Sequence, residues 1–111
     1  MSLAHKDLAE GRWNELSLME QLGNVGSEVS RTIQAKKRGD DARAISAFER
    51  SLELFDLTLA CPQNSGRCRE ITRAREFWVD FYSGSNQYGF TDQAWEEYFL
   101  QFGIAARRRH N

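Results

Sequence analysis

Polar side chains that could form a site follow one flank of a predicted helical hairpin over residues 17–59. If its two helices run antiparallel about a turn at residues 38 and 39, positions whose numbers sum to about 77 lie side by side. Three polar pairs satisfy this relation: Gln21 with Asp56, Asn24 with Glu53, and Glu28 with Glu49. These side chains either form a polar site between the helices or belong to a solvated acidic face, and a charge run on an amphipathic helix usually faces water.

Arginines form a second group of candidate binding residues. Arg67 and Arg69 lie at the start of the predicted third helix, and Arg107, Arg108 and Arg109 lie near the end of the chain. An up-down-up-down arrangement brings both segments to the same end of the molecule, where they could bind the phosphates of a nucleic acid. The alternative is that these arginines bind no ligand and are the charges that are common near a helix C-terminus. It is favoured because no aromatic side chain is interleaved with these arginines to stack on bases.

The cysteines and histidines offer no credible nucleophilic site. Cys61 and Cys68 flank the turn between the second and third helices. Without a secretory context, two cysteines are expected to be free thiols rather than a disulfide or half a zinc site. His5 and His110 are the only histidines and lie near the two ends of the chain, so we expect no Cys-His or Ser-His arrangement. The cysteines and histidines therefore argue against an enzyme, and we expect no cofactor.

The hairpin that carries the polar pairs has clear helix signals. Its apolar stripes are Leu18, Leu22, Val25, Val29 and Ile33, then Ile45, Phe48, Leu52, Phe55 and Leu59. Ser17 and Glu20 predict a capping box at the start of the first helix. Gly39 predicts a left-handed stop, and Asp40 or Asp41 is expected to cap the second helix.

Two glycines, Gly23 and Gly26, lie inside the first helix of the hairpin. Each should destabilise the helix by about 1 kcal/mol relative to alanine. Because glycine has no side chain, a second helix can approach closely at these positions. We therefore expect a close helix–helix contact to compensate.

The hairpin contains two short motifs, Glu20-Gln21-Leu22-Gly23-Asn24 and Glu53-Leu54-Phe55-Asp56. In these the chain partly resembles the all-α nucleoside triphosphate pyrophosphatases (MazG-like), in which Glu-Glu-x-Gly-Glu and a later Glu-x-x-Asp hold magnesium. The resemblance implies a nucleotide pyrophosphatase with Mg²⁺ as its only cofactor. The metal ligands would come from Glu28, Glu49, Glu53 and Asp56, with Gln21 and Asn24. Amides replace two carboxylates of the first motif, although Mg²⁺ favours charged oxygen ligands.

Two further helices complete the predicted fold, an all-α, antiparallel, up-down-up-down four-helix bundle. The four helices are expected over about residues 17–38, 41–60, 65–83 and 91–108. Asn64 or Ser65 is the predicted cap of the third helix, and Thr91 that of the fourth. Phe90 and Trp95 have the spacing of a hydrophobic staple around Thr91.

Length and composition limit the remaining possibilities. At 111 residues the chain is expected to form an N-terminal arm or short helix over 1–16 and a single bundle domain over 17–111. The formal net charge of −1 gives no overall field that would attract nucleic acid or a membrane. Without a long apolar run or a signal-peptide core, we expect no membrane association and a cytoplasmic location.

Aromatic residues are concentrated in the second half of the chain, where ten of the thirteen fall between residues 77 and 102. Candidates for a partner interface are Phe77, Trp78, Phe81, Trp95 and Phe99. Aromatic groups are enriched in interface cores, so a homo-oligomer is favoured over a bulky monomer core. The favoured function is a non-catalytic bundle that self-associates and contacts a protein partner. The alternatives are the MazG-like pyrophosphatase and a nucleic-acid accessory protein.

Overall fold

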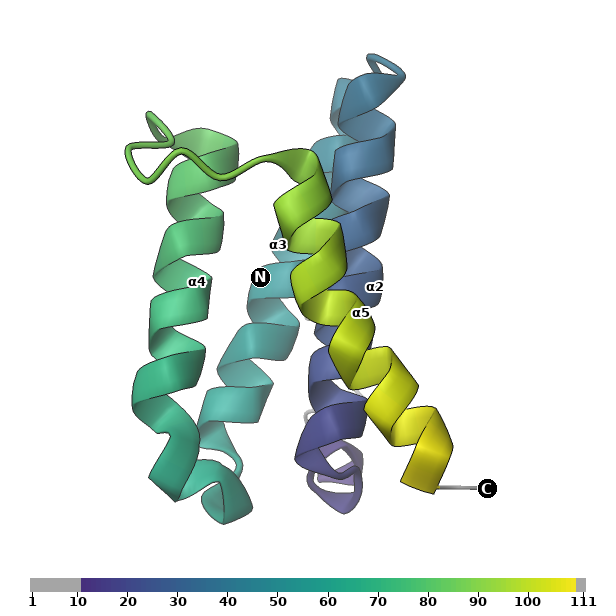
Figure 1. The fold of residues 1–111 in the computed structure, drawn as a ribbon, viewed down its shortest axis with the longest axis vertical. Helices are drawn as coiled ribbons and strands as arrows, with labels where there is room; N and C mark the ends of the chain where they lie inside the picture. Colours follow the sequence, from purple (N-terminus) through teal and green to yellow (C-terminus); the bar gives the residue numbers. More distant parts are fainter. Residues whose placement is uncertain (1–10, 110–111) are drawn as a thin grey trace.

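The protein is an all-α four-helix bundle, as predicted (Figure 1). The computed structural model describes residues 11–109. Its elements are η1 (Arg12–Glu15), α2 (Leu18–Lys37), α3 (Asp41–Ala60), η2 (Pro62–Arg67), α4 (Cys68–Ser83) and α5 (Asp92–Arg109), where η denotes a 3-10 helix. Most of the predicted N-terminal arm, with His5, and His110 lie outside the described residues. Within residues 11–109, no helix is both long and apolar enough to cross a membrane.

The ends of the α2–α3 hairpin form as predicted, from side chains within one helical turn. The Ser17 hydroxyl accepts from the Glu20 amide, and the Glu20 carboxylate accepts from the Ser17 amide, which completes the capping box. Gly39 follows α2 with a φ of 75°, a left-handed conformation that glycine adopts without strain. Asp40 then caps α3 by accepting from the Arg43 amide at 3.2 Å.

The stripe predicted for α3 is confirmed in part: Phe55 is fully buried, and Phe48, Leu52 and Leu59 pack against the core. Ile45, which opens the predicted stripe, is 50% exposed, and Phe48 is only partly buried. The buried face consists of Ala44, Ala47, Ser51, Leu54, Phe55 and Thr58. Most of these side chains are small, which lets α2 and α3 approach closely. Phe48 instead packs toward α4, with ring centroids 5.8 Å from Trp78 and 4.3 Å from Tyr82.

Glycines allow α2 to pack closely against α5 on its other side. A Cβ atom at Gly26 would lie 2.5 Å from Phe99 Cβ, a separation that carbon atoms do not tolerate. A Cβ at Gly23 would lie 3.5 Å from Gly103 Cα, which is ordinary van der Waals contact. The predicted close approach at these two glycines is confirmed, and the neighbouring helix is α5.

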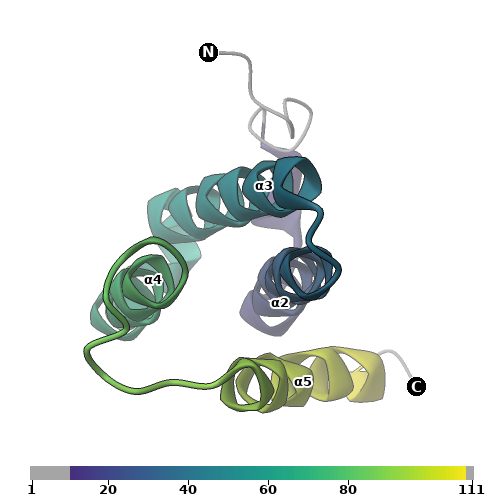
Figure 2. The ribbon, with the colours of Figure 1, turned by 90° about the horizontal axis from the view of Figure 1, so that it is seen from above.

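The four helices do not close into a ring. Helix α2 packs along α3 on one side and α5 on the other, and α3 also packs against α4. Seen from above, α4 and α5 lie at the two ends of this series and are joined by the loop over residues 84–91 (Figure 2). Among the described helices, α4 and α5 share few close backbone contacts. The bundle is therefore open along the α4–α5 seam.

The predicted cap of the third helix is wrong. Helix α4 begins at Cys68, after η2, and its N-cap residue Arg67 makes no side-chain cap hydrogen bond. Asn64 is buried instead, and its side-chain amide donates to Gln21 Oε1 at 2.7 Å and to the Thr58 carbonyl at 2.9 Å. Its hydrogen bonds therefore join η2 to α2 and α3, and η2 replaces the first predicted turn of the helix.

A tryptophan from η1 closes the same end of the bundle. Trp13 is 1% exposed, and its indole N–H donates to Thr58 Oγ1 at 3.1 Å. Gln21 Nε2 donates to the Trp13 carbonyl at 2.9 Å. Because each buried polar group here has a partner, the network stabilises this end without leaving an unpaired donor or acceptor.

Candidate functional site

The candidate metal ligands are engaged in separate interactions. Glu28 is 4% exposed and its carboxylate accepts from Arg31 Nη1 at 2.6 Å and from Arg50 Nε at 3.1 Å. Asp56 lies at the surface and accepts from Arg75 Nε at 2.9 Å. Asp56 is thus paired with an arginine of α4. Neither carboxylate faces the other.

The other four candidates are also spread over the hairpin. Gln21 is fully buried in the polar network described above, whereas Asn24 is exposed and donates to the Glu20 carbonyl. Glu49 is exposed and Glu53 is half-buried. Over residues 11–109, no three His, Cys, Asp or Glu side chains are placed so that they could hold a metal ion. The resemblance to the pyrophosphatases remains a prediction.

The arginines predicted to cluster at one end of the bundle lie on opposite sides of it. The start of α4, with Arg67 and Arg69, and the end of α5, with Arg107, Arg108 and Arg109, are at the same end of the molecule. Both ribbon views place them at its two opposite edges (Figures 1 and 2). The two segments are therefore apart at that end of the molecule.

The two cysteines are free thiols, as predicted. Cys61 is buried, and Gln21 Nε2 lies 3.6 Å from its sulfur. Cys68 is half-buried, and its thiol donates weakly to the Asn64 carbonyl at 3.7 Å. Both thiols thus belong to the packing around η2.

Three of the five aromatic interface candidates are core residues. Trp78 is 0% exposed, and Trp95 and Phe99 are each 4% exposed, so the chain itself covers them. This corrects the prediction that they contact a partner. Phe77 and Phe81 are only partly buried and still reach the surface. The aromatic surface that remains is centred on the open seam between α4 and α5.

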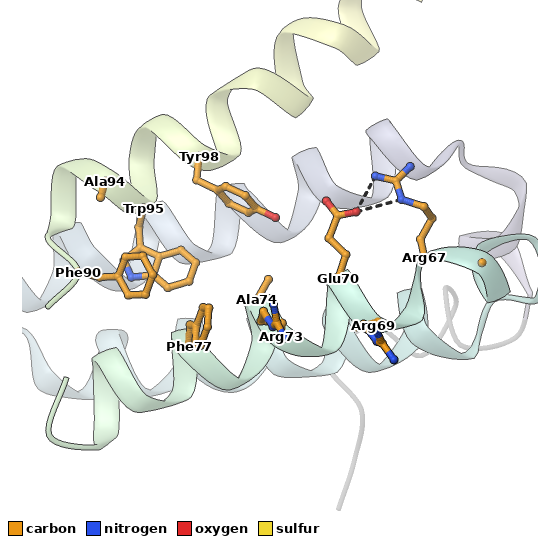
Figure 3. Close-up of a pocket in the computed structure, with 11 residues that line it drawn as sticks. Arg67, Arg69, Glu70, Arg73, Ala74, Phe77, Phe90, Ala94, Trp95 and Tyr98 are labelled. Carbon is orange, nitrogen blue, oxygen red and sulfur yellow. Dashed lines mark hydrogen bonds and ion pairs between the residues drawn. The ribbon is translucent and has the colours of Figure 1, made fainter. Parts of the chain in front are cut away.

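A groove of about 630 Å³ runs along this seam (Figure 3). Its apolar walls are formed by Ala74, Phe77, Phe90, Ala94, Trp95 and Tyr98. Its polar edge, at the start of α4, is formed by Arg67, Arg69, Glu70 and Arg73. The volume is within the range of protein ligand sites. We call this feature the α4–α5 groove.

Aromatic packing at the loop end holds the two walls in place. Trp95 on α5 packs edge-on against Trp78 of α4, with ring centroids 5.4 Å apart. The ring centroids of Phe90 and Trp95 are 5.2 Å apart, which confirms the predicted staple. The Phe90 ring also packs against Phe77, with centroids 5.5 Å apart. Farther along α4 the small side chain of Ala74 leaves space that these rings do not fill.

The loop before α5 fixes the orientation of Phe90. The Asn86 side chain accepts from the Phe90 amide at 3.0 Å and donates to the Phe90 carbonyl at 2.9 Å. Thr91 then caps α5 as predicted, with its hydroxyl accepting from the Ala94 amide at 3.1 Å. These local bonds place Phe90 and Ala94 on the groove wall.

The polar edge of the groove carries a net positive charge. Glu70 Oε2 accepts from Arg67 Nη2 at 2.8 Å and from Arg67 Nε at 3.0 Å, so these two charges compensate. Arg69 and Arg73 make no ion pair with another residue in the described part of the chain. Two arginine charges therefore remain beside the apolar walls.

Tyr98 reaches from α5 toward the polar edge. Its hydroxyl points at the Arg67–Glu70 pair across the groove (Figure 3). Burial raises the pKa of the Tyr98 phenol, the nearby Glu70 carboxylate raises it further, and Arg67 acts in the opposite direction. Tyr98 is therefore a neutral hydroxyl at physiological pH, available as a donor or an acceptor.

Several groove residues were not predicted as site residues, among them Glu70, Arg73, Ala74 and Tyr98, whereas Arg69 and Phe77 were candidates for other sites. Glu70, Ala74 and Phe77 are spaced four and three residues apart, so they share one face of α4. Arg69 and Arg73 follow the same helical spacing on the adjacent face. The spacing was visible in the sequence, but nothing local indicated that α5 leaves this face uncovered.

Comparisons of the chain with protein-family models, with curated proteins and with solved structures found no match. The function must therefore be inferred from the fold and the groove. Together they define an all-α protein with an apolar groove that has basic side chains along one edge.

Proposed function

We propose that this protein is a non-catalytic binding protein whose α4–α5 groove receives an acidic amphipathic helix from another protein. The observation that carries the proposal is the combination of apolar walls with Arg69 and Arg73, which have no ion-pair partner among the described residues. This combination occurs at the seam where α4 and α5 share few close backbone contacts.

The shape and chemistry of the walls suit a helix. Helix α2 is covered on both sides by α3 and α5, whereas α4 and α5 each present apolar side chains to the open seam. An amphipathic helix binds such a groove through apolar residues at positions i, i+3, i+4 and i+7. Bound there, it would cover Phe77 and Tyr98 and complete the packing of the bundle.

The charges favour an acidic partner. Arg69 and Arg73 are four residues apart on α4, which separates them by about 6 Å along the helix axis. Glutamates four residues apart on a partner helix have the same spacing and could pair with both. Exposed pairs contribute only about 0.2–1 kcal/mol each. The arginines should therefore set orientation and association rate, and apolar burial should supply most of the affinity.

The same charges argue against a second copy of this chain as the occupant. A two-fold interface brings identical patches together, so the arginine edges of two molecules would meet each other. Like charges facing across an interface are unfavourable. Self-association through the aromatic half remains a prediction, and the experiment below distinguishes it from binding of another protein.

The test uses a labelled synthetic helix with leucines at positions i, i+3, i+4 and i+7 and glutamates on its flanks, together with a lysine-flanked version. Ala74→Trp should fill the groove, and Ala42→Trp places the same side chain on the exposed start of α3 as a control. We expect the acidic helix to bind the wild type and the Ala42→Trp variant equally, and the Ala74→Trp variant at least about tenfold more weakly, a loss of about 1.4 kcal/mol. Replacing both Arg69 and Arg73 by alanine should remove the preference for the acidic helix.

Two results would refute the proposal. The first is unchanged binding of the acidic helix to the Ala74→Trp variant, or equally tight binding of the lysine helix to the wild type. The second would come from light scattering over a concentration series. A dimer that dissociates in the Ala74→Trp variant, but not in the Ala42→Trp variant, would make a second copy of the chain the occupant.

A further inference from the structure

A second groove, of about 500 Å³, lies between α2 and α3 beside the hairpin turn. Its floor contains Ala35 and Ala47, both 2% exposed, so the helices approach closely beneath it. Four arginines line its walls: Arg31 of α2 and Arg38 at the C-cap of α2, and Arg43 and Arg50 of α3. We call this feature the α2–α3 groove. It is separate from the α4–α5 groove and shares no residue with it.

The spacing of these arginines forms two rows across the hairpin. On each helix the two arginines are seven residues apart, or about 10 Å along the axis. Because α2 and α3 are antiparallel, Arg31 lies beside Arg50, and both bind the Glu28 carboxylate. Arg38 and Arg43 form the second row, next to the turn. The groove thus presents two pairs of guanidinium groups about 10 Å apart.

Internal bonds hold the first row in place and leave donors available. The buried Glu28 carboxylate accepts from Arg31 Nη1 and from Arg50 Nε, while Arg50 Nη1 donates to Ser46 Oγ at 2.7 Å. A guanidinium carries five N–H donors, so each arginine keeps several for a ligand. Glu28 therefore acts as a positioning residue for Arg31 and Arg50.

The second row carries the same net charge as the first, with two arginines and one carboxylate. Asp40 pairs with Arg43 at 3.3 Å, whereas Arg38 makes no ion pair with another described residue. Among the described residues that line the groove, none is acidic and none is aromatic. The lining is thus suited to anions and offers no stacking surface for a base.

We infer that the α2–α3 groove binds the phosphate groups of a polyanion, with one phosphate at each row of arginines. Arginine presents donors in the planar arrangement that phosphate oxygens accept. Because the lining lacks aromatic rings, phosphate rather than base chemistry determines recognition. Phosphates about 10 Å apart on one chain occur in a nucleic-acid strand and in inorganic polyphosphate, and both sources share this chemistry.

The test measures fluorescence anisotropy with labelled 12-nucleotide oligo(dT) and oligo(dA), at several salt concentrations from about 50 to 200 mM. If all four arginines contact phosphate, log K should fall against log salt with a slope of about −2.8. In the Arg38→Ala/Arg43→Ala variant the slope should become less steep by about 1.4, and affinity at about 50 mM salt should fall on the order of 10- to 100-fold. The Arg69→Ala/Arg73→Ala variant removes equal charge from the other groove and should behave as the wild type.

Inorganic polyphosphate serves as an unlabelled competitor. Displacement of both oligonucleotides at similar affinity supports phosphate recognition from either source. Binding of the oligonucleotides without displacement supports the groove as a nucleic-acid site. The inference is overturned if neither the oligonucleotides nor polyphosphate binds, if Arg38→Ala/Arg43→Ala leaves affinity and slope unchanged, or if the control variant loses as much binding. Circular dichroism of both variants checks that these surface changes leave the helices intact.

Discussion

Replacing Gly26 by alanine should destabilise the bundle, although alanine is the better helix former. The new Cβ would lie 2.5 Å from Phe99 Cβ and 3.0 Å from Phe99 Cγ. Favourable carbon–carbon contacts lie at about 3.5–4.0 Å, so α5 must move away from α2 by about 1 Å. A rotamer change cannot relieve this overlap, because the Cβ of Phe99 is fixed to the backbone of α5.

The expected magnitude follows from two opposing effects. Alanine gains about 1 kcal/mol of helix propensity over glycine. Overpacking of a filled core costs about 1–3 kcal/mol, and an overlap this short belongs at the upper end of that range. The variant should therefore be less stable by about 2 kcal/mol. For a domain of this size the melting temperature should fall by about 8 °C.

Gly23→Ala is the matched control on the same helix. Its Cβ would lie 3.5 Å from Gly103 Cα, an ordinary contact, so the propensity gain is not opposed by a clash. Thermal unfolding followed by circular dichroism should show Gly23→Ala to be at least as stable as the wild type. If Gly26→Ala proves as stable as Gly23→Ala, then α2 and α5 do not pack closely at Gly26 and the reasoning is refuted.

Four further predictions concern side chains in the core and the α4–α5 groove. Asn64→Ala leaves Gln21 Oε1 and a backbone carbonyl without their buried donor, and urea unfolding should show a loss of about 2–4 kcal/mol. Trp78→Phe removes a fully buried indole and its hydrogen bond to a serine hydroxyl, and the same assay should show a loss of about 2–3 kcal/mol. Because the pKa of Tyr98 is raised in the folded state, its contribution to stability is complete below about pH 10 and is lost as the pH rises through the folded value. Unfolding free energy should thus fall less steeply above pH 10 in Tyr98→Phe than in the wild type. Absorbance titration should show that Glu70→Gln brings the Tyr98 pKa closer to its ordinary value.

The features predicted correctly from the sequence depend on neighbours within one or two helical turns. The capping box of α2, the Asp40 cap of α3 and the Thr91 cap of α5 each join residues three positions apart. Gly23 and Gly26 also carried a usable signal, because glycine inside a helix needs a compensating contact. Local chemistry alone determines the caps, so a single sequence is sufficient to predict them.

The stripe predicted for α3 missed its small buried residues because it was chosen by side-chain size. The buried residues of α3 include Ala44, Ala47 and Ser51, whose small size permits close packing. Larger residues such as Phe48 lie on the flank toward α4. Burial in α3 is thus determined by how near its neighbours lie, and that distance depends on residues elsewhere in the chain.

The candidate sites likewise depend on how the helices pack against one another. Phe77 and Arg67 were both selected from the sequence, but for different sites, and the structure places them in one groove. That groove exists because α4 and α5 diverge below the contact between Trp78 and Trp95. The two rows of arginines in the α2–α3 groove depend in turn on the phase of α3. Neither the shared groove nor the two rows of arginines can be predicted from residues that are a few positions apart in the sequence.

The most direct test of the central claim is to map where the acidic helix binds, by following the amide resonances of the protein during a titration. Binding in the α4–α5 groove should shift Ala74, Ala94 and Tyr98 most strongly and should leave Ala47, in the α2–α3 groove, unchanged. Leu100 provides an internal comparison, because it is 56% exposed on α5 and does not line the α4–α5 groove. Shifts centred on Leu100 or on Ala47, with Ala74 and Ala94 unaffected, would contradict the proposed function.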